Sequence, residues 1–178
     1  SLTLLTVTAC SEKPNDSNVG ESHDHGHGHS HHHDHKNHHA HSKHHGIVVP
    51  LLSGQKQVAF AEIKLHDDKG DLELWLTKDQ SGNIPMDIAL NSKLKVSLPK
   101  LETKSLKLAV RNRAKNEDED GKATIRNSKT NYFIFPGDSG VDAAFLTGKK
   151  FSTNAVISFE LDGVEYTTKS FRLRPHTH

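Results

Sequence analysis

Hydrophobic and polar residues alternate in short runs after position 46, and this pattern predicts β-strands. The run QVAFAEIKL (57–65) places two alanines, an isoleucine and a leucine on one face. In LELWLT (72–77) three leucines face one way. A period of two is typical of strands that bury one face. The stretches HDDKGD and DQSGN after these runs are rich in turn-forming residues, so each run is expected to end in a turn.

Similar runs predict further strands at 86–90, 94–98, 105–111, 123–127 and 131–135. The clearest pair is 151–161 and 164–173, because Asp162-Gly163 between two alternating runs is typical of a type I′ hairpin. The segment 141–146 is the only helical candidate, at most one turn long.

These elements predict an all-β domain. About eight short strands with no alternation of strands and helices favour an antiparallel β-sandwich, Ig-like or related. A barrel of similar strand count is the alternative.

Composition divides the chain into three parts. Residues 1–10 are apolar and fit the remnant of a truncated export signal. Residues 11–46 contain almost no large apolar residue except Val19, so they cannot bury enough surface to offset the entropy lost on ordering. We therefore predict a disordered, histidine-rich tether over 11–46 and a β-domain over 47–178.

The stretch Val7-Thr8-Ala9-Cys10 resembles the lipobox of bacterial lipoproteins, whose cysteine becomes the acylated first residue of the mature protein. A plain secretory signal that ends at a cysteine is the alternative. The resemblance implies that Cys10, the only cysteine, is lipidated, and several acyl chains give stable membrane attachment. Because Ser11 and not Asp follows, it also implies the outer membrane, facing the periplasm.

Charge argues against a nucleic-acid partner. Lys and Arg number 23 and Asp and Glu 22, which gives +1 with neutral histidines. A nucleic-acid binder usually concentrates basic residues on one face. Protonation of all 16 histidines would move the charge from +1 to +17, so the protein becomes strongly cationic in acid.

The predicted β-domain has little catalytic chemistry, and we expect no enzyme activity. It lacks a cysteine, a Gly-x-Ser-x-Gly motif, a glycine-rich phosphate loop and a His-Glu-x-x-His motif. His66 lies near Asp67, Asp68 and Asp71, which is either a small metal or acid–base site or, as favoured here, a polar hairpin tip.

Two further segments offer metal ligands. The acidic stretch 116–121 lacks the spacing of a calcium loop and is expected to be a solvated loop. His176 and His178 form an HxH at the end of the chain, where a dangling tail is the default interpretation and auxiliary metal binding, as for His66, the other.

The strongest signal is a tract with thirteen histidines in the twenty-three positions from 23 to 45. A neutral imidazole is the commonest protein ligand for Zn²⁺, Ni²⁺ and Cu²⁺. Four imidazoles satisfy a tetrahedral zinc ion, so the tract could supply about three exchangeable sites. The predicted ligands are His23, His25, His27, His29, His31, His32, His33, His35, His38, His39, His41, His44 and His45.

Three other interpretations of the tract were considered. A purification tag is usually an unbroken terminal run, whereas here other residues interrupt the histidines. A passive linker gains nothing from histidine that serine or glycine would not supply. A pH sensor needs a bistable partner, and none is visible in the sequence. Protonation must expel bound metal, which connects the pH and metal interpretations.

The whole layout resembles the His-rich envelope lipoproteins and the His-rich segments of bacterial zinc-uptake and nickel-handling proteins. The resemblance implies a lipid-anchored metal buffer, chaperone or accessory of metal transport, binding Zn²⁺ first, with Ni²⁺ or Cu²⁺ behind it. Its partners would be the membrane and a metal efflux or uptake component. The alternative function is a non-catalytic interaction or structural module, with the tract as spacer or pH-responsive linker.

Overall fold

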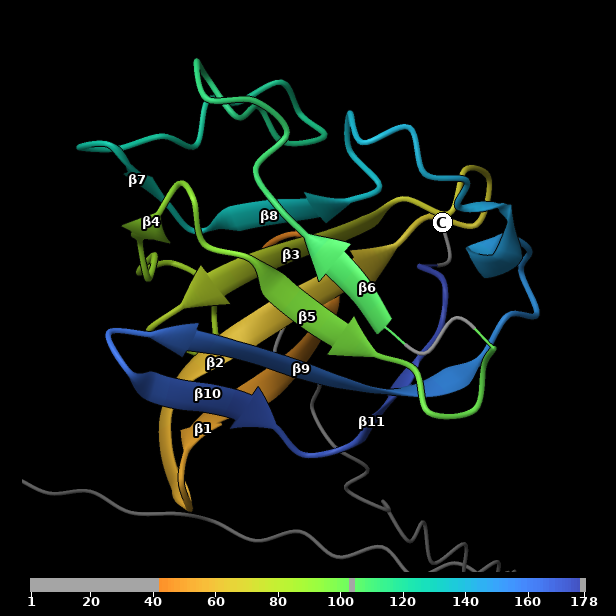
Figure 1. The fold of residues 1–178 in the computed structure, drawn as a ribbon, viewed down its shortest axis with the longest axis horizontal. Helices are drawn as coiled ribbons and strands as arrows, with labels where there is room; N and C mark the ends of the chain where they lie inside the picture. The colour runs from red at the N-terminus through yellow and green to blue at the C-terminus, as the bar shows by residue number, and fades with distance from the viewer. Residues whose placement is uncertain (1–41, 103–104, 177–178) are drawn as a thin grey trace, which may run out of the picture. The chain divides into compact units, whose positions relative to one another are not determined.

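The computed structural model describes residues 42–102 and 105–176, and its regular elements there are strands apart from one 3₁₀ turn (Figure 1). The predicted signal remnant 1–10 and most of the predicted tether 11–46 lie outside the described residues. The elements are β1 (Ile47–Ser53), β2 (Lys56–Leu65), β3 (Leu72–Thr77), β4 (Ile88–Ala89), β5 (Leu94–Ser97), β6 (Ser105–Leu108), β7 (Lys129–Thr130), β8 (Tyr132–Phe135), η1 (Ala144–Leu146), β9 (Thr153–Leu161), β10 (Val164–Thr168) and β11 (Phe171–Leu173).

The strands form one large antiparallel sheet, which confirms the predicted all-β fold. Its order is β6-β5-β9-β10-β1-β2-β3-β8, with β11 added beside β9, while β4 and β7 form a separate pair. The two ends of the sheet meet, because Ala109, just after β6, exchanges backbone hydrogen bonds of 3.1 and 2.9 Å with Ile134 of β8. The sheet is therefore nearly closed, in a barrel-like way.

One face of each long strand lines a common core. Leu51 of β1, Ile63 of β2, Leu74 of β3 and Ile157 of β9 are fully buried. Figure 1 shows β5, β6 and β9 in front of β2 and β3, so that two parts of the sheet enclose these side chains. This confirms the alternation predicted from the sequence.

The outer face of β3 and of the second half of β2 is buried as well. All six residues of β3 are buried, including Glu73 and Trp75, which alternate with the core leucines. On β2, Glu62 is 1% exposed and Lys64 is 5% exposed. The residues that cover this face belong to two segments, 42–46 before β1 and the long loop 109–131 between β6 and β8, as the contacts below show. We call the first segment the strap and the second the 109–131 loop.

Asn116 fixes the 109–131 loop to the sheet. Its side chain is fully buried, its Oδ1 accepts the Arg111 amide (2.8 Å), and its Nδ2 donates to Tyr132 O (2.9 Å) and Thr124 Oγ1 (3.0 Å). Its φ is +49°, a left-handed conformation that asparagine tolerates better than most residues. The stretch 116–121 is therefore only partly the solvated loop expected, because Asn116 and Asp118 are buried.

The structure corrects several predicted elements. No strand was predicted for 47–53, where Pro50 interrupts an apolar run, yet β1 forms. The predicted strand 123–127 does not form, because positive φ angles at Asn127 and Ser128 turn the chain into the short strand β7.

After residue 140 the predicted elements agree better with the structure. The predicted strand 164–173 is divided into β10 and β11. The Asp162-Gly163 hairpin is confirmed, with φ of +52° and +77° as a type I′ turn requires, and η1 is the single turn expected within 141–146.

Replacing Asn116 by alanine is expected to destabilise the protein by about 2–3 kcal/mol, because buried backbone groups of Arg111 and Tyr132 lose their partner. Denaturant unfolding followed by tryptophan fluorescence measures the change, and the exposed Asn91→Ala is the matched control. An Asn116→Ala variant as stable as the control would show that this side chain does not fix the loop.

Candidate functional site

His66 follows β2 in a turn closed by backbone hydrogen bonds. Its amide donates to Asp71 O (2.9 Å), and the Gly70 amide donates to His66 O (3.1 Å). The sequence suggested Asp67, Asp68 and Asp71 as carboxylate partners of His66. Within the described residues, its ion pairs are instead with Glu73 of β3 and Glu119 of the 109–131 loop.

Five side chains form a connected group around this imidazole, which we call the His66 cluster. Nε2 of His66 lies 2.8 Å from Glu73 Oε2 and 3.5 Å from Glu119 Oε2. The ammonium of Lys64 donates to both oxygens of Glu119, at 2.6 and 2.7 Å. The hydroxyl of Tyr132 donates to Glu73 Oε1. The cluster thus runs in one chain of contacts from Tyr132 to Lys64.

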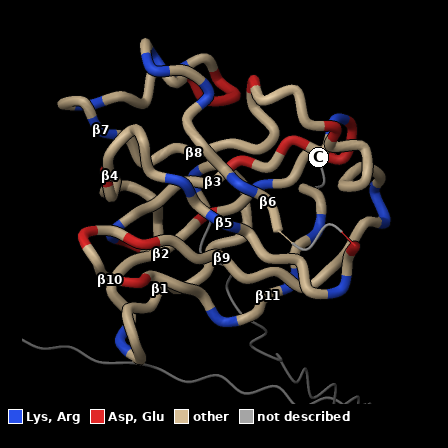
Figure 2. Tube along the Cα trace, viewed as in Figure 1, with Lys and Arg blue, Asp and Glu red and all other residues tan. Residues whose placement is uncertain are grey.

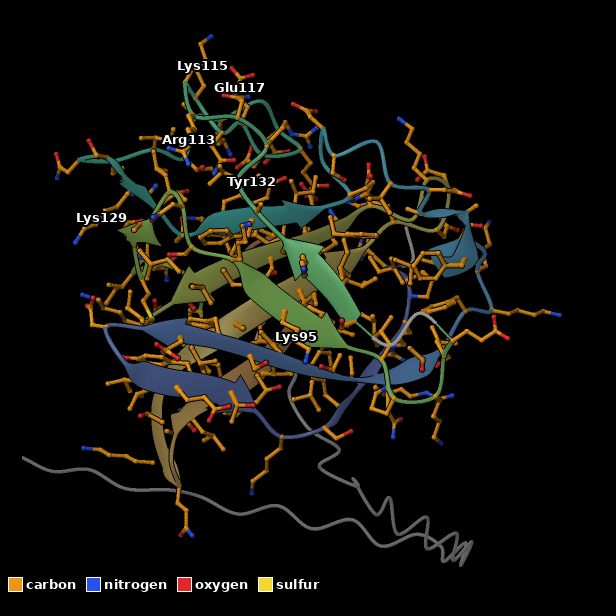
Figure 3. The ribbon with its side chains drawn as sticks, in the orientation of Figure 1. Lys95, Arg113, Lys115, Glu117, Lys129 and Tyr132 are labelled. Carbon is orange, nitrogen blue, oxygen red and sulfur yellow. The ribbon has the colours of Figure 1, made fainter. Side chains whose placement is uncertain are left out.

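The strand register explains how these residues meet. Lys64 on β2 lies directly opposite Glu73 on β3, and β8, which carries Tyr132, is the other neighbour of β3. Glu119 comes from the 109–131 loop, which passes over β8; in Figure 3, Lys115 and Glu117 lie on the outer part of this loop, away from Tyr132. Lys64, Glu73 and Tyr132 are almost fully buried, whereas the side chains of His66 and Glu119 are 22% and 26% exposed.

Electrostatics favours a charged His66–Glu73 pair. The hydrogen bond that its ring donates to the Glu73 carboxylate raises the pKa of His66 despite its partial burial. Burial raises the pKa of Glu73, but hydrogen bonds from His66 and Tyr132 outweigh this effect, so the pKa is lowered. Burial and the adjacent Glu73 charge raise the pKa of Tyr132, which stays a neutral donor. Without a metal, these contacts favour the imidazolium form of His66 beside the Glu73 carboxylate.

The strap carries the last two histidines of the tract onto the outer face of β2 and β3. The ring of His44 stacks on Trp75 with centroids 4.1 Å apart and planes 3° from parallel. Glu62 Oε1 accepts the amides of His44 (2.8 Å) and Gly46 (2.9 Å). Burial lowers the pKa of His44, so this ring favours its neutral form.

The end of the tract also meets the C-terminal segment. The rings of His45 and His176 have centroids 6.0 Å apart. The amide of His176 donates to Leu65 O (2.9 Å). Leu65 ends β2 and directly precedes His66, so His176 lies beside this end of β2. His66 and His176, two of the auxiliary metal ligands predicted from the sequence, therefore both lie next to the C-terminal end of β2.

The structure describes only some of the predicted site residues. His44, His45, His66 and His176 are described. The lipidation candidate Cys10, the terminal His178 and eleven tract histidines lie outside the described residues; these eleven are His23, His25, His27, His29, His31, His32, His33, His35, His38, His39 and His41.

Sequence reasoning missed four members of the His66 cluster. A signal existed for two of them, since Lys64 and Glu73 occur in strands whose supposedly solvent-facing side also carries Trp75, a large residue that is rarely left exposed. Tyr132 was placed in a strand without a role. Glu119 gave no signal, because a loop residue far away in sequence reaches the site only through tertiary structure.

The cluster offers one imidazole nitrogen and two carboxylate oxygens, whose ligand atoms lie within 4.8 Å of one another. This donor set suits a divalent cation, and it also suits an ion-pair network that fixes the loop. Acidic and basic residues are interspersed along the described trace, in keeping with the balanced composition (Figure 2).

Comparison of the chain with protein-family models, curated proteins and solved structures found no match, so the site is interpreted from its own geometry. Over residues 42–102 and 105–176, no helix has the length and apolar character needed to span a membrane.

The pKa shifts of His66 and His44 predict opposite effects of pH on stability. The pKa of His66 is higher in the folded state than in the unfolded state, where it is about 6.5. The stability that protonated His66 contributes is therefore fully present below about pH 6.5 and is lost as the pH rises through the pKa of the folded state. The stability lost in His66→Gln should therefore be larger at pH 5.5 than at pH 8.5. For His44→Gln, whose pKa is lowered, the loss should be larger at pH 8.5. Metal-free denaturant unfolding at the two pH values measures both differences, and equal losses for His66→Gln at both would contradict the charged pair.

Proposed function

We propose that this protein is a lipid-anchored protein of the bacterial envelope that binds transition-metal ions, Zn²⁺ first and Ni²⁺ or Cu²⁺ behind it. The observation that carries the proposal is the density of ligands in the tract, thirteen imidazoles in twenty-three residues. Neutral imidazole binds all three metals well, and a passive linker would gain nothing from so many histidines.

The spacing of the tract favours several interchangeable sites. His23, His25, His27 and His29 recur at every second residue, so consecutive imidazoles are roughly 6–7 Å apart along an extended chain. Closing four of them around one ion forms only short loops, whose entropic cost is modest. Gly26 and Gly28 ease the bending. Such sites exchange metal readily, which suits a buffer or a protein that passes metal on.

Attachment to the membrane through Cys10 would keep the metal-binding tract near the membrane surface. The lipobox-like Val7-Thr8-Ala9-Cys10 supports acylation at Cys10, and Ser11 supports the outer membrane, facing the periplasm. The tract itself spans at most about 75–80 Å when extended, and the 35 residues that follow Cys10 up to His45 span at most about 125 Å, so the tether keeps the ligands within that distance of the membrane. Tethering raises their effective concentration at a membrane partner, such as a metal efflux or uptake component.

The folded domain supports the proposal by holding the end of the tract. His44 lies flat on Trp75, and Glu62 accepts two amides of the strap, so the last tract residues have a fixed place on the domain. His45 faces His176 there. Zinc bound by two imidazoles at about 2.0–2.1 Å has ring centroids roughly 5–6 Å apart, so this pair lies close to a metal-binding separation. In this proposal the domain anchors and presents the tract and performs no catalysis.

Zinc uptake by the unaltered full-length chain and two full-length variants tests the proposal. In the tract variant, the eleven histidines from His23 to His41 are replaced by serine, while the control variant replaces Lys36, Asn37 and Lys43 by serine and keeps every histidine. Equilibrium dialysis should find about three zinc ions per unaltered chain, from four imidazoles per ion, and the same number in the control. The tract variant should lose about two or more of them. Equal uptake by all three chains would remove the tract as the metal-binding element and favour an interaction module with a histidine-rich spacer.

A further inference from the structure

We propose that His66, Glu73 and Glu119 form a fixed site for one divalent transition-metal ion, such as Zn²⁺, on the folded domain. This site deepens the proposed function, on which it rests for the identity of the metal. Two of its ligands, His66 in the turn after β2 and Glu73 on β3, are seven residues apart, but the third, Glu119, comes from the distant 109–131 loop, so the complete site exists only in the folded protein.

The distances are close to those of a metal site. His66 Nε2 lies 2.8 Å from Glu73 Oε2 and 3.5 Å from Glu119 Oε2, and all three ligand atoms lie within 4.8 Å of one another. Ligand atoms around a tetrahedral zinc with bonds of about 2.0–2.1 Å are roughly 3.3 Å apart. Side-chain movements of about 1 Å would therefore bring the three atoms into coordination, without a change of backbone.

Two carboxylate oxygens, Glu73 Oε2 and Glu119 Oε2, face one imidazole nitrogen in the cluster. Nε2 of His66 carries at most one hydrogen, and the 2.8 Å contact gives that hydrogen to Glu73. Glu119 Oε2 also faces Nε2, at a distance beyond a good hydrogen bond. One cation at this point would serve the imidazole and both carboxylates together.

Neighbouring donors hold both carboxylates in the orientation that a metal needs. Glu73 Oε1 accepts the Tyr132 hydroxyl, which leaves Oε2 toward His66. Glu119 accepts the Lys64 ammonium at both oxygens, 2.6 Å from Oε1 and 2.7 Å from Oε2, and its Oε2 also faces His66. Carboxylate ligands of metals are typically fixed by hydrogen bonds in this way, which orients them before the ion arrives.

The place of the site suits transfer from the tract. His45 and His176 lie beside Leu65, the residue before His66, so the tract ends at the strand end that carries the fixed ligands. One nitrogen and two carboxylate oxygens form a harder donor set than imidazoles alone, so relative to the tract this site shifts the preference toward harder ions such as Zn²⁺ and Mn²⁺. The side chains of His66 and Glu119 are partly exposed, so an ion can reach them from solvent.

Thermal unfolding of the full-length chain with and without Zn²⁺ tests the site. An ion bound only by the folded state raises the melting temperature, by roughly 5–10 °C at a hundredfold excess over Kd for a domain of this size. Tract ligands lie close together in sequence and are present in the unfolded chain too, so they contribute little to this shift. The shift should therefore persist in the tract variant defined above.

Each ligand variant is compared with its own metal-free melting temperature, so a loss of stability does not obscure the result. His66→Gln and Glu119→Gln should both abolish the zinc-dependent shift. The matched control is Glu117→Gln, two residues away in the same loop and 42% exposed in a contact with Lys115, and it should keep the full shift.

The outcomes separate the two proposals. No shift in the unaltered chain, or the same shift in His66→Gln, Glu119→Gln and Glu117→Gln, overturns the fixed site even if dialysis finds zinc in the tract. A shift that the two ligand variants abolish supports the fixed site, even if replacing the tract leaves zinc uptake unchanged and the proposed function fails.

Discussion

The burial of charged side chains on the outer face of β2 and β3 is the constraint on which the rest of this structure depends. Glu62, Lys64 and Glu73 are almost completely removed from solvent, on the face that strand periodicity would leave exposed. A buried charge is costly unless it is paired and hydrogen-bonded. Each of these residues therefore has a partner that comes from outside the two strands or from the turn that joins them.

These pairings arrange the rest of the outer face. Glu62 accepts hydrogen bonds from amides of the strap, and Lys64 pairs with Glu119 of the 109–131 loop. Glu73 contacts His66 and Tyr132. The end of the histidine tract, the loop and the C-terminal His176 consequently meet near the end of β2. The candidate metal ligands are concentrated there because the contacts that give the buried charges their partners also bring these segments together.

Much of the fold could be predicted from the sequence because strand periodicity and turn residues act locally. The alternation in β2, β3 and β9 and the Asp162-Gly163 turn gave the all-β fold and the clearest hairpin. Because Pro50 interrupts the apolar pattern of 47–53, the sequence did not predict β1. The alternating run 123–127 does not form a strand, because Asn127 and Ser128 adopt positive φ angles. The candidate site is harder to predict from the sequence. His66 is a candidate there, but the partners that the sequence suggests are the nearby aspartates and not Glu73 and Glu119. Glu119 reaches it from 53 positions away, and only the folded loop makes that contact.

We propose that this protein binds metal and holds one ion on the folded domain, near the end of the tract. An anomalous difference map from crystals of the full-length chain grown with Zn²⁺ in excess tests this directly. We expect a zinc peak about 2.0–2.2 Å from His66 Nε2 and from one oxygen each of Glu73 and Glu119. A map without this peak, in which His66 Nε2 still contacts Glu73 at hydrogen-bond distance, would contradict it.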